Sequence, residues 1–398
     1  MWKKLATNTG VQLVGRVTTI LIGLVTTAWL TRNLGLEGYG RYTLLVALFV
    51  LLDNLADFGS KLVGAKEVSK VEGDKRWSKW SELLVWRGVW AAVITVLGVA
   101  LVMTLTGFEE FRGVAALSMV MVGLTAMAGT LEVGWQVSLK MERKVAVEVL
   151  MSALTLVGFY LAGAGAGLGE VIGVLVGARI ISLSWGWLKM RGDMRIRPTK
   201  IDRKKFWGWL RTFAPMGWYM LIFAGYDRVV DTMMIGHWWG KQEVGWYGLG
   251  YKIYANLIMP AYYLVSSALP VWVGNIKGKD WEKKLFGITM AGAVGAAVFC
   301  WIGAPLMVQI LGGEQFLPTI GVLRWLSLAL VAAYHNHYWG FKLLAQNKEK
   351  IILQTGLFTL IINITLNLLV IPDYGIMGAA AVTVATEIMS GLILRLKA

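Results

Sequence analysis

Apolar segments long enough to cross a lipid bilayer recur along the whole chain. A spanning helix needs about 20 predominantly apolar residues. Segments of that length lie at 9–31, 42–62, 83–106, 113–138, 145–164, 168–190, 209–238, 247–273, 285–311, 319–344, 350–371 and 374–395. Only 16% of the residues are charged, whereas soluble domains average about 25%. This pattern predicts an all-α integral membrane protein with about twelve transmembrane helices.

Lysine and arginine gather at alternate ends of these segments. Counted around the predicted spans, 29 lie on one side, and only Arg32, Arg41, Arg112 and Lys241 lie on the other. Because cytoplasmic loops carry the excess of basic residues, the N- and C-termini are predicted to be cytoplasmic, in a multi-pass protein of the cell (inner, cytoplasmic) membrane. The net charge of +15 is therefore interpreted as a topology signal, and no nucleic-acid partner is predicted.

An internal repeat divides the chain into halves. A shift of 205 residues places Gly35 on Gly240, Gly40 on Gly245 and Tyr42 on Tyr247. Each half holds six predicted spans. Because six is an even number, the two halves should have the same orientation in the membrane, as the parallel repeats of many transporters do. We expect an N-terminal six-helix lobe over 1–190 and a C-terminal lobe over 209–398. A basic cytoplasmic linker over 191–208 should join them.

Charged side chains inside the apolar segments mark candidate functional positions. A charge at the bilayer centre costs roughly 2.5–3.5 kcal/mol on insertion scales. Arg16 and Arg179 lie midway along their segments with no acid one turn away on the same helix, so both are expected to face a cavity between the lobes. Lys252 and Arg324, nearer the outer ends, are candidates for the same cavity or for snorkelling. Asp53 is a further cavity candidate.

A second group of charges is assigned to gating or ion coupling. Asp227, Arg228 and Asp231 share one segment, where internal pairing and function are equally compatible with the pattern. Glu387 lies midway along the last segment. A shift of about 208 residues sets Arg179 on Glu387, so these two are expected to face each other across the lobe interface.

Internal pairing is also expected near the cytoplasmic end of the second segment. Asp57 precedes Lys61 by one helical turn, a spacing at which opposite charges attract each other. We therefore interpret Asp57 chiefly as the structural partner of Lys61.

Motifs for catalysis and metal binding are absent from the sequence. No G-x-S-x-G, G-x-x-x-x-G-K-[ST] or H-E-x-x-H occurs. The single cysteine and the three histidines form no metal-site pattern. The sequence therefore predicts a protein that is not an enzyme, with no catalytic residues, metal site or cofactor.

Three stretches resemble the polysaccharide-biosynthesis flippases of the Wzx type, in the multidrug/oligosaccharidyl-lipid/polysaccharide exporter superfamily. They are LTRNLGLEGYGRY at 30–42 followed by LADFG at 55–59, YDRVVDTMMIGHWWGKQEVGWYGLGYKIY at 226–254 followed by the LP of 269–270, and NLLVIPDYGIMGAAAVTVATE at 367–387. The resemblance implies two six-helix lobes around a central cavity. It also implies that a polyprenyl-pyrophosphate-linked oligosaccharide is moved from the cytoplasmic to the outer leaflet by alternating access. Membrane lipids and glycan-assembly proteins are the further partners considered.

Two other functions are kept as alternatives. A cation-coupled multidrug exporter of the same superfamily would favour acidic residues in its cavity. An integral-membrane glycan polymerase or ligase would show large outside loops, whereas the outside loops predicted here are about a dozen residues or fewer. The basic residues at mid-membrane depth favour an anionic cargo.

Overall fold

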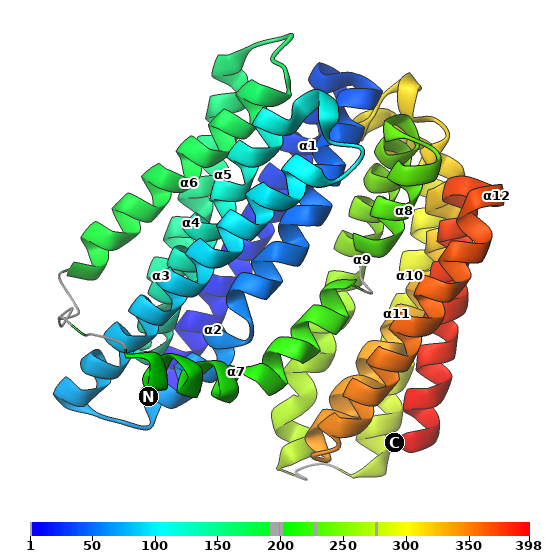
Figure 1. Ribbon diagram of the computed structural model, residues 1–398. Helices are drawn as coiled ribbons and strands as arrows, with labels where there is room; N and C mark the ends of the chain where they lie inside the picture. The colour runs from blue at the N-terminus through cyan, green and yellow to red at the C-terminus, as the bar shows by residue number, and fades with distance from the viewer. Residues whose placement is uncertain (1, 192–198, 200–201, 226–228, 275–277) are drawn as a thin grey trace. The chain divides into compact units, whose positions relative to one another are not determined.

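A computed structural model describes residues 2–191, 199, 202–225, 229–274 and 278–398 (Figure 1). Throughout this part of the chain the secondary structure is helical, with no strand. The elements are α1 (Trp2–Asp57), α2 (Ser60–Ser69), α3 (Gly73–Thr104), η1 (Glu109–Phe111), α4 (Arg112–Val137), α5 (Met141–Ala162), α6 (Leu168–Arg191), α7 (Arg203–Ala224), α8 (Val230–Trp238), α9 (Lys241–Val273), α10 (Lys279–Leu311), η3 (Glu314–Phe316), α11 (Thr319–Ala345) and α12 (Glu349–Lys397). The predicted all-α membrane class is confirmed.

Eight helices among the described residues are long and apolar enough to cross a membrane. Two of them are much longer than a bilayer requires: α1 has 56 residues and α12 has 49. Each contains one glycine with non-helical backbone angles, Gly35 in α1 and Gly375 in α12. Both have positive φ, a conformation that costs glycine little. Gly35 lies between the predicted segments 9–31 and 42–62, and Gly375 lies at the start of the predicted segment 374–395. The total of about twelve spans stays a prediction.

The helices pack into two compact units. Unit 1 comprises Met1–Leu34 and Leu45–Ala224, and unit 2 comprises Gly35–Leu44 and Gly225–Ala398. The boundary after Ala224 places α7 in unit 1, although part of α7 was expected in the second lobe. The assignment of lobes to 1–190 and 209–398 stays a prediction.

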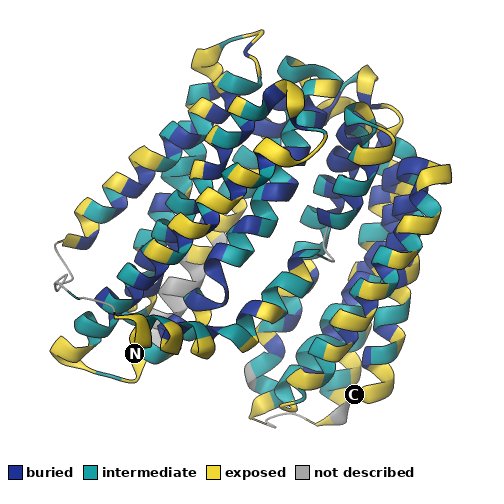
Figure 2. Cartoon of the chain, viewed as in Figure 1, coloured by how far each residue is buried: buried dark blue, intermediate teal, exposed yellow. Residues whose placement is uncertain are grey.

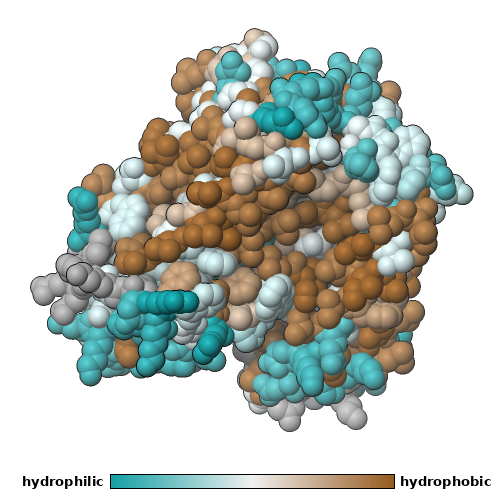
Figure 3. All heavy atoms as spheres, viewed as in Figure 1, coloured by the Kyte–Doolittle hydropathy of each residue, from teal (hydrophilic) through white to brown (hydrophobic). Residues whose placement is uncertain are grey.

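Each unit has an aromatic core and apolar side chains on its outside. In unit 1, Trp80, Trp86, Trp135 and Phe213 are buried together. In unit 2, α11 packs against α9, α10 and α12, with Tyr334 and Tyr338 buried in small clusters. Figure 2 shows exposed positions recurring along the helices, and Figure 3 shows that the apolar ones form broad areas between hydrophilic helix ends. Large exposed apolar areas of this kind suit contact with lipid.

The glycines of the repeat make a reciprocal contact within unit 2. A Cβ atom built on Gly40 would lie 1.7 Å from the carbonyl oxygen of Lys241, and one built on Gly245 would lie 2.7 Å from that of Leu36. The 205-residue shift relates Leu36 to Lys241 as it relates Gly40 to Gly245. The two contacts are therefore equivalent, as a local two-fold axis requires. Only glycine lets the two helices approach this closely.

Candidate functional site

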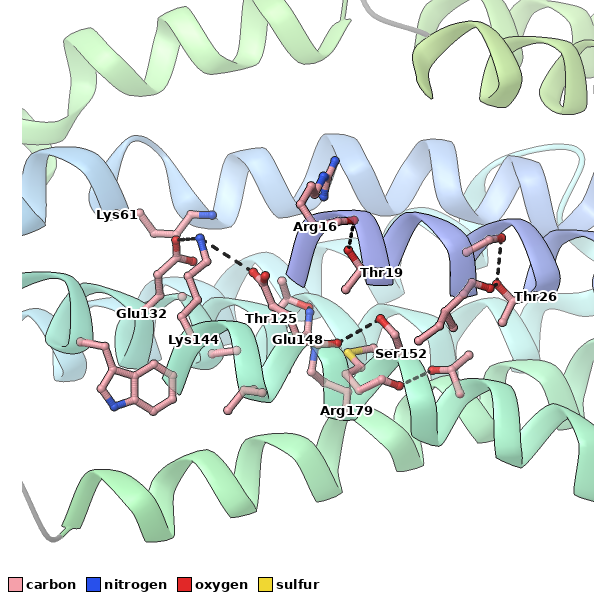
Figure 4. A pocket seen from close by; sticks show the side chains of 18 residues that line it. Arg16, Thr19, Thr26, Lys61, Thr125, Glu132, Lys144, Glu148, Ser152 and Arg179 are labelled. Atoms are coloured by element: carbon pink, nitrogen blue, oxygen red, sulfur yellow. Dashed lines mark hydrogen bonds and ion pairs between the residues drawn. The ribbon is translucent and has the colours of Figure 1, made fainter. Parts of the chain in front are cut away.

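A polar cavity of about 420 Å³ lies within unit 1 (Figure 4). Its walls come from α1, α4, α5 and α6, with Lys61 contributed by α2. The charged lining residues are Arg16, Lys61, Lys144, Arg179, Glu132 and Glu148. The hydroxyl-bearing lining residues are Thr19, Thr26, Thr125, Ser152 and Thr155. The cavity thus combines four cationic side chains and two carboxylates with several neutral hydrogen-bonding groups.

Lys144 contacts both carboxylates of the cavity. Its ammonium group makes a close ion pair with Glu132 of α4, and its Nζ lies 3.8 Å from Oε1 of Glu148, one turn along α5. Figure 4 shows Lys144 and Glu132 pointing toward each other, with Lys61 beside them. One cation of the cavity therefore offsets much of its negative charge.

Arg179 retains hydrogen-bonding capacity. Its Nη2 donates to the Thr125 hydroxyl at 3.2 Å. Its Nε is buried and has no hydrogen-bond partner within the described part of the chain. It interacts electrostatically with Asp53 and Glu148, but no carboxylate lies within 4 Å in the described structure. A planar guanidinium placed this way can donate to an anionic group that enters the cavity.

Arg16 and Lys61 add to the positive charge. Arg16 is exposed at its position on α1 and lies within electrostatic range of Lys144 and Glu148. Lys61, half-buried, forms no ion pair with any described residue. The lining therefore has an excess of two positive charges, which favours an anion over a cation.

The two mid-span arginines predicted from the sequence line the same cavity. It lies inside unit 1, and the expectation that they face a cavity between the lobes stays a prediction. Asp53 is half-buried on α1 and is not among the lining residues, although it interacts electrostatically with Arg179.

The other two cavity candidates belong to unit 2 and do not line this cavity. Arg324 is exposed, and its guanidinium carbon lies 5.8 Å from the centre of the Trp301 ring. Lys252 is half-buried on α9. That Lys252 and Arg324 face a cavity between the lobes stays a prediction.

The predicted pairing of Asp57 with Lys61 is wrong. Asp57 Oδ1 instead accepts a hydrogen bond from Nη1 of Arg87 at 2.7 Å. Arg87 is 1% exposed, and it also donates to the Thr130 hydroxyl and to the Ala126 carbonyl oxygen. Arg87 can saturate its donors in the packed core, so Asp57 is buried there, while Lys61 is at the cavity.

A second polar cluster surrounds Asp231 in unit 2. Asp231 is 1% exposed. Its Oδ2 accepts from the Tyr247 hydroxyl at 2.6 Å, and its Oδ1 accepts from the Asn367 amide at 2.7 Å. The Thr383 hydroxyl lies 3.5 Å from Oδ2. In the described structure, Oδ1 of Asn367 is buried without a partner.

The remaining gating candidates are placed as follows. Glu387 accepts hydrogen bonds from the Asn336 amide through its carboxylate and its backbone carbonyl. Its pairing with Arg179 stays a prediction. Asp227 and Arg228 lie outside the described residues.

Four of the charged lining residues were not proposed as site residues from the sequence. Lys144 was counted only as a topology signal, and Lys61 as a topology signal and as the partner of Asp57. Glu132 was noted only as a charge inside the segment 113–138, and Glu148 was given no role. One signal was available: Lys144 and Glu148 are one turn apart, so they share a face of α5. Nothing comparable marks Arg87, because its partners come from three other helices.

A family model described as "Polysaccharide biosynthesis protein" matches residues 5–273. The chain belongs to the polysaccharide biosynthesis protein family. This confirms the resemblance found in the sequence. A curated relative, the probable low-salt glycan biosynthesis flippase Agl15 of Haloferax volcanii, is 22% identical over 369 residues, covering 88% of this chain and 74% of the relative.

Solved structures share the fold. The lipid II flippase MurJ, in an inward closed conformation, superposes with a TM-score of 0.77 at 14% identity, covering 96% of this chain and 86% of MurJ. An inward-facing multidrug resistance MATE family transporter of the MOP superfamily superposes with a TM-score of 0.75 at 15% identity. The superposition covers 95% of this chain and 94% of the transporter. A MOP superfamily transporter from Pyrococcus furiosus, reported with a binding pocket of reverse polarity, superposes with a TM-score of 0.65 at 14% identity. The superposition covers 99% of this chain and 94% of that transporter. This polysaccharide biosynthesis family member therefore has the fold of the MOP superfamily transporters.

Proposed function

We propose that the protein is a flippase for polyprenyl-pyrophosphate-linked oligosaccharide. It moves this lipid from the cytoplasmic to the outer leaflet of the cell membrane by alternating access, and both of its termini are cytoplasmic. The observation that carries the proposal is the excess positive charge of the unit 1 cavity.

The chemistry of such a cargo fits this cavity. A pyrophosphate is anionic and loses much of its hydration when it leaves water, so it needs fixed cations and hydrogen-bond donors. Arg16, Arg179 and Lys61 supply the charge, and the threonine and serine hydroxyls supply further polar contacts. The prenyl tail can stay in lipid.

The family and its relatives support this cargo over the alternatives. The family model is named for polysaccharide biosynthesis, and the curated relative is named as a glycan biosynthesis flippase. A cationic drug would meet the positive excess of the cavity and be repelled. We therefore assign a transport function without catalysis, and place glycan-assembly proteins among the partners.

We assign ion coupling to Asp231. A buried carboxylate surrounded by hydroxyl and amide groups can exchange a proton or hold a monovalent cation, and intramembrane acids commonly act this way in transporters. The unpartnered Asn367 oxygen supports this role, because it offers a further acceptor beside the carboxylate.

Reconstitution into proteoliposomes tests the proposed function. A polyprenyl-pyrophosphate-linked oligosaccharide is placed in one leaflet, and its appearance in the other is followed with a membrane-impermeant reagent that modifies glycans. A cationic dye is assayed in parallel. The proposal predicts flipping of the lipid-linked glycan above the rate of protein-free liposomes. Transport of the dye alone would support the exporter alternative instead.

A further inference from the structure

Helix α7 is strongly amphipathic and is fixed to the rest of unit 1 by its apolar face. Trp209, Phe213 and Gly217 recur every four residues and are buried. The carbonyl oxygen of Phe206 accepts a hydrogen bond from the Trp86 indole at 3.1 Å. A Cβ atom on Gly217 would lie 2.5 Å from the Phe58 ring, so α7 packs tightly. Figure 1 shows its first half running across the direction of α3.

The opposite face of α7 carries basic and aromatic side chains that are exposed. Arg203, Lys204, Trp207, Arg211 and Trp218 fall on one stripe of the helix and are all exposed. Trp207 and Trp218 are 49% and 61% exposed. Tryptophan beside lysine and arginine on one helix face is typical of a helix that lies at a membrane surface.

A groove of about 250 Å³ opens where α7 meets α3. It is lined by Val85, Trp86, Val89, Asp202, Arg203 and Phe206. One oxygen of Asp202 accepts from the backbone amide of Lys205 at 2.7 Å. Lys205 is itself paired with Glu82 at 2.8 Å, so Arg203 is the basic side chain that borders the groove.

The apolar wall of the groove continues along α3. Val89, Val93 and Val96 follow one another along this helix and are 49%, 52% and 69% exposed. They lie within the apolar segment of α3, at increasing distance from its basic N-terminal end. The exposed valines begin beside Arg203 in the groove. This arrangement suits a phospholipid, in which an apolar acyl chain is attached to a phosphate headgroup.

We propose that this corner of unit 1, formed by α3 and the exposed stripe of α7, binds an anionic phospholipid of the cytoplasmic leaflet. Arg203, Lys204 and Arg211 hold the phosphate headgroup, and one acyl chain lies along Val85, Val89 and Val93. The preference for an anionic lipid follows from charge, because the exposed stripe of α7 carries three basic residues. The one acidic residue that lines the groove, Asp202, already accepts a hydrogen bond from the backbone amide of Lys205.

Photocrosslinking in nanodiscs tests this site. The full-length protein is embedded in phosphatidylcholine with a small fraction of photoactivatable phosphatidylglycerol, and the labelled peptides are mapped. We expect labelling in α3 near Val89 and in α7. Arg203→Gln/Arg211→Gln should reduce it by roughly five-fold for each basic residue removed. The matched control, Lys283→Gln/Lys284→Gln, removes two exposed charges from α10 in unit 2 and should leave the labelling unchanged.

A second variant keeps the charges and obstructs the groove. Val89→Trp should lower labelling without changing the basic stripe, and soluble glycerol phosphate should not compete. Three results would each overturn the proposal: equal labelling of α3 and α7 in Arg203→Gln/Arg211→Gln, equal labelling by a phosphatidylcholine probe, or competition by glycerol phosphate as effective as by the lipid.

Discussion

At the scale of single residues, Arg87 and Arg179 of unit 1 differ in how their hydrogen-bond donors are used. Arg87 is almost completely buried and donates to a carboxylate, hydroxyls and a backbone carbonyl. Arg179 is half-buried and keeps one buried Nε without a partner among the described residues. A saturated arginine holds helices together, whereas an unsaturated one at a cavity can bind an incoming anion.

Removing Asp57 should destabilise the protein strongly. Asp57→Ala leaves Arg87 as an uncompensated buried charge, which costs about 3–5 kcal/mol. The loss is measured as the free energy of unfolding in mixed micelles titrated with denaturing detergent. Glu67→Ala, which removes partially exposed ion pairs with Lys70 and Lys79, is the control and should cost about 1 kcal/mol or less.

A double variant separates charge from packing at this pair. Asp57→Ala/Arg87→Leu removes both charges and should recover much of the lost stability. If Asp57→Ala were no more destabilising than Glu67→Ala, the ion pair would not contribute as described.

Asp231→Asn should make transport independent of ion gradients. The amide keeps the size of the carboxylate but cannot carry the charge that binds a proton or cation. In proteoliposomes with an imposed sodium or proton gradient, we expect the wild-type protein to respond to one of the two and the variant to respond to neither. A variant that kept the full response would exclude Asp231 as the coupling residue.

Residue roles could be predicted from the sequence only in part. The depth of Arg16 and Arg179 in their segments marked them as candidates, because charge in an apolar run is visible in the sequence. The pairing of Asp57 with Arg87 was not visible, since it depends on how α3 packs against the end of α1. The cavity charges of Lys61 and Lys144 were hidden, because lysines near span ends are equally explained by topology.

At the scale of elements, glycines determine where helices turn and where they touch. Gly35 and Gly240, matched by the 205-residue repeat, have φ of 65° and 86°. The next matched pair, Gly40 and Gly245, makes the reciprocal contact within unit 2. The repeat was visible in the sequence because the turns require glycine, but the contact required the fold.

Adding a methyl group at this contact should separate the helices. Gly40→Ala and Gly245→Ala place a Cβ against a backbone carbonyl, so the backbone must shift, and each should cost about 1–3 kcal/mol. The equivalence of the two contacts predicts losses of the same sign and similar size. Thermal unfolding in detergent measures them.

Gly295→Ala is the control for these variants. A Cβ at Gly295 meets no atom within 4 Å, so this variant should be as stable as the wild-type protein. Full stability in Gly40→Ala would contradict the close approach of α1 and α9.

At the scale of the whole molecule, hydropathy and charge predicted the membrane class, but no residue pattern predicted the boundaries of the compact units. The membrane class followed from the length and number of apolar segments. Most predicted segments each fall on one observed helix, whereas 42–62 extends from α1 into α2 and 209–238 extends from α7 into α8. The boundaries of the compact units did not follow, because Gly35–Leu44 joins unit 2 through packing with distant residues. No local sequence feature reports such packing.

The predicted topology can be tested by labelling from outside intact cells. Single cysteines are introduced at Lys204 and at Lys241 in a Cys300→Ala background, which removes the one native cysteine. An impermeant thiol reagent should label the Lys241→Cys protein and spare the Lys204→Cys protein until the cells are opened. The reverse labelling would invert the topology and place the basic linker outside.

The most direct test of the central claim is the rate at which Arg179 variants flip a lipid-linked glycan. In proteoliposomes containing equal amounts of folded protein, Arg179→Met and Arg16→Met should each lower the rate at least ten-fold, equivalent to about 1.4 kcal/mol or more, because the pyrophosphate loses a fixed cation. Arg179→Lys should retain part of the rate, and Lys350→Met, which removes an exposed charge outside the cavity, should match the wild-type protein. Wild-type rates in both Arg179→Met and Arg16→Met would contradict the cationic-cavity mechanism.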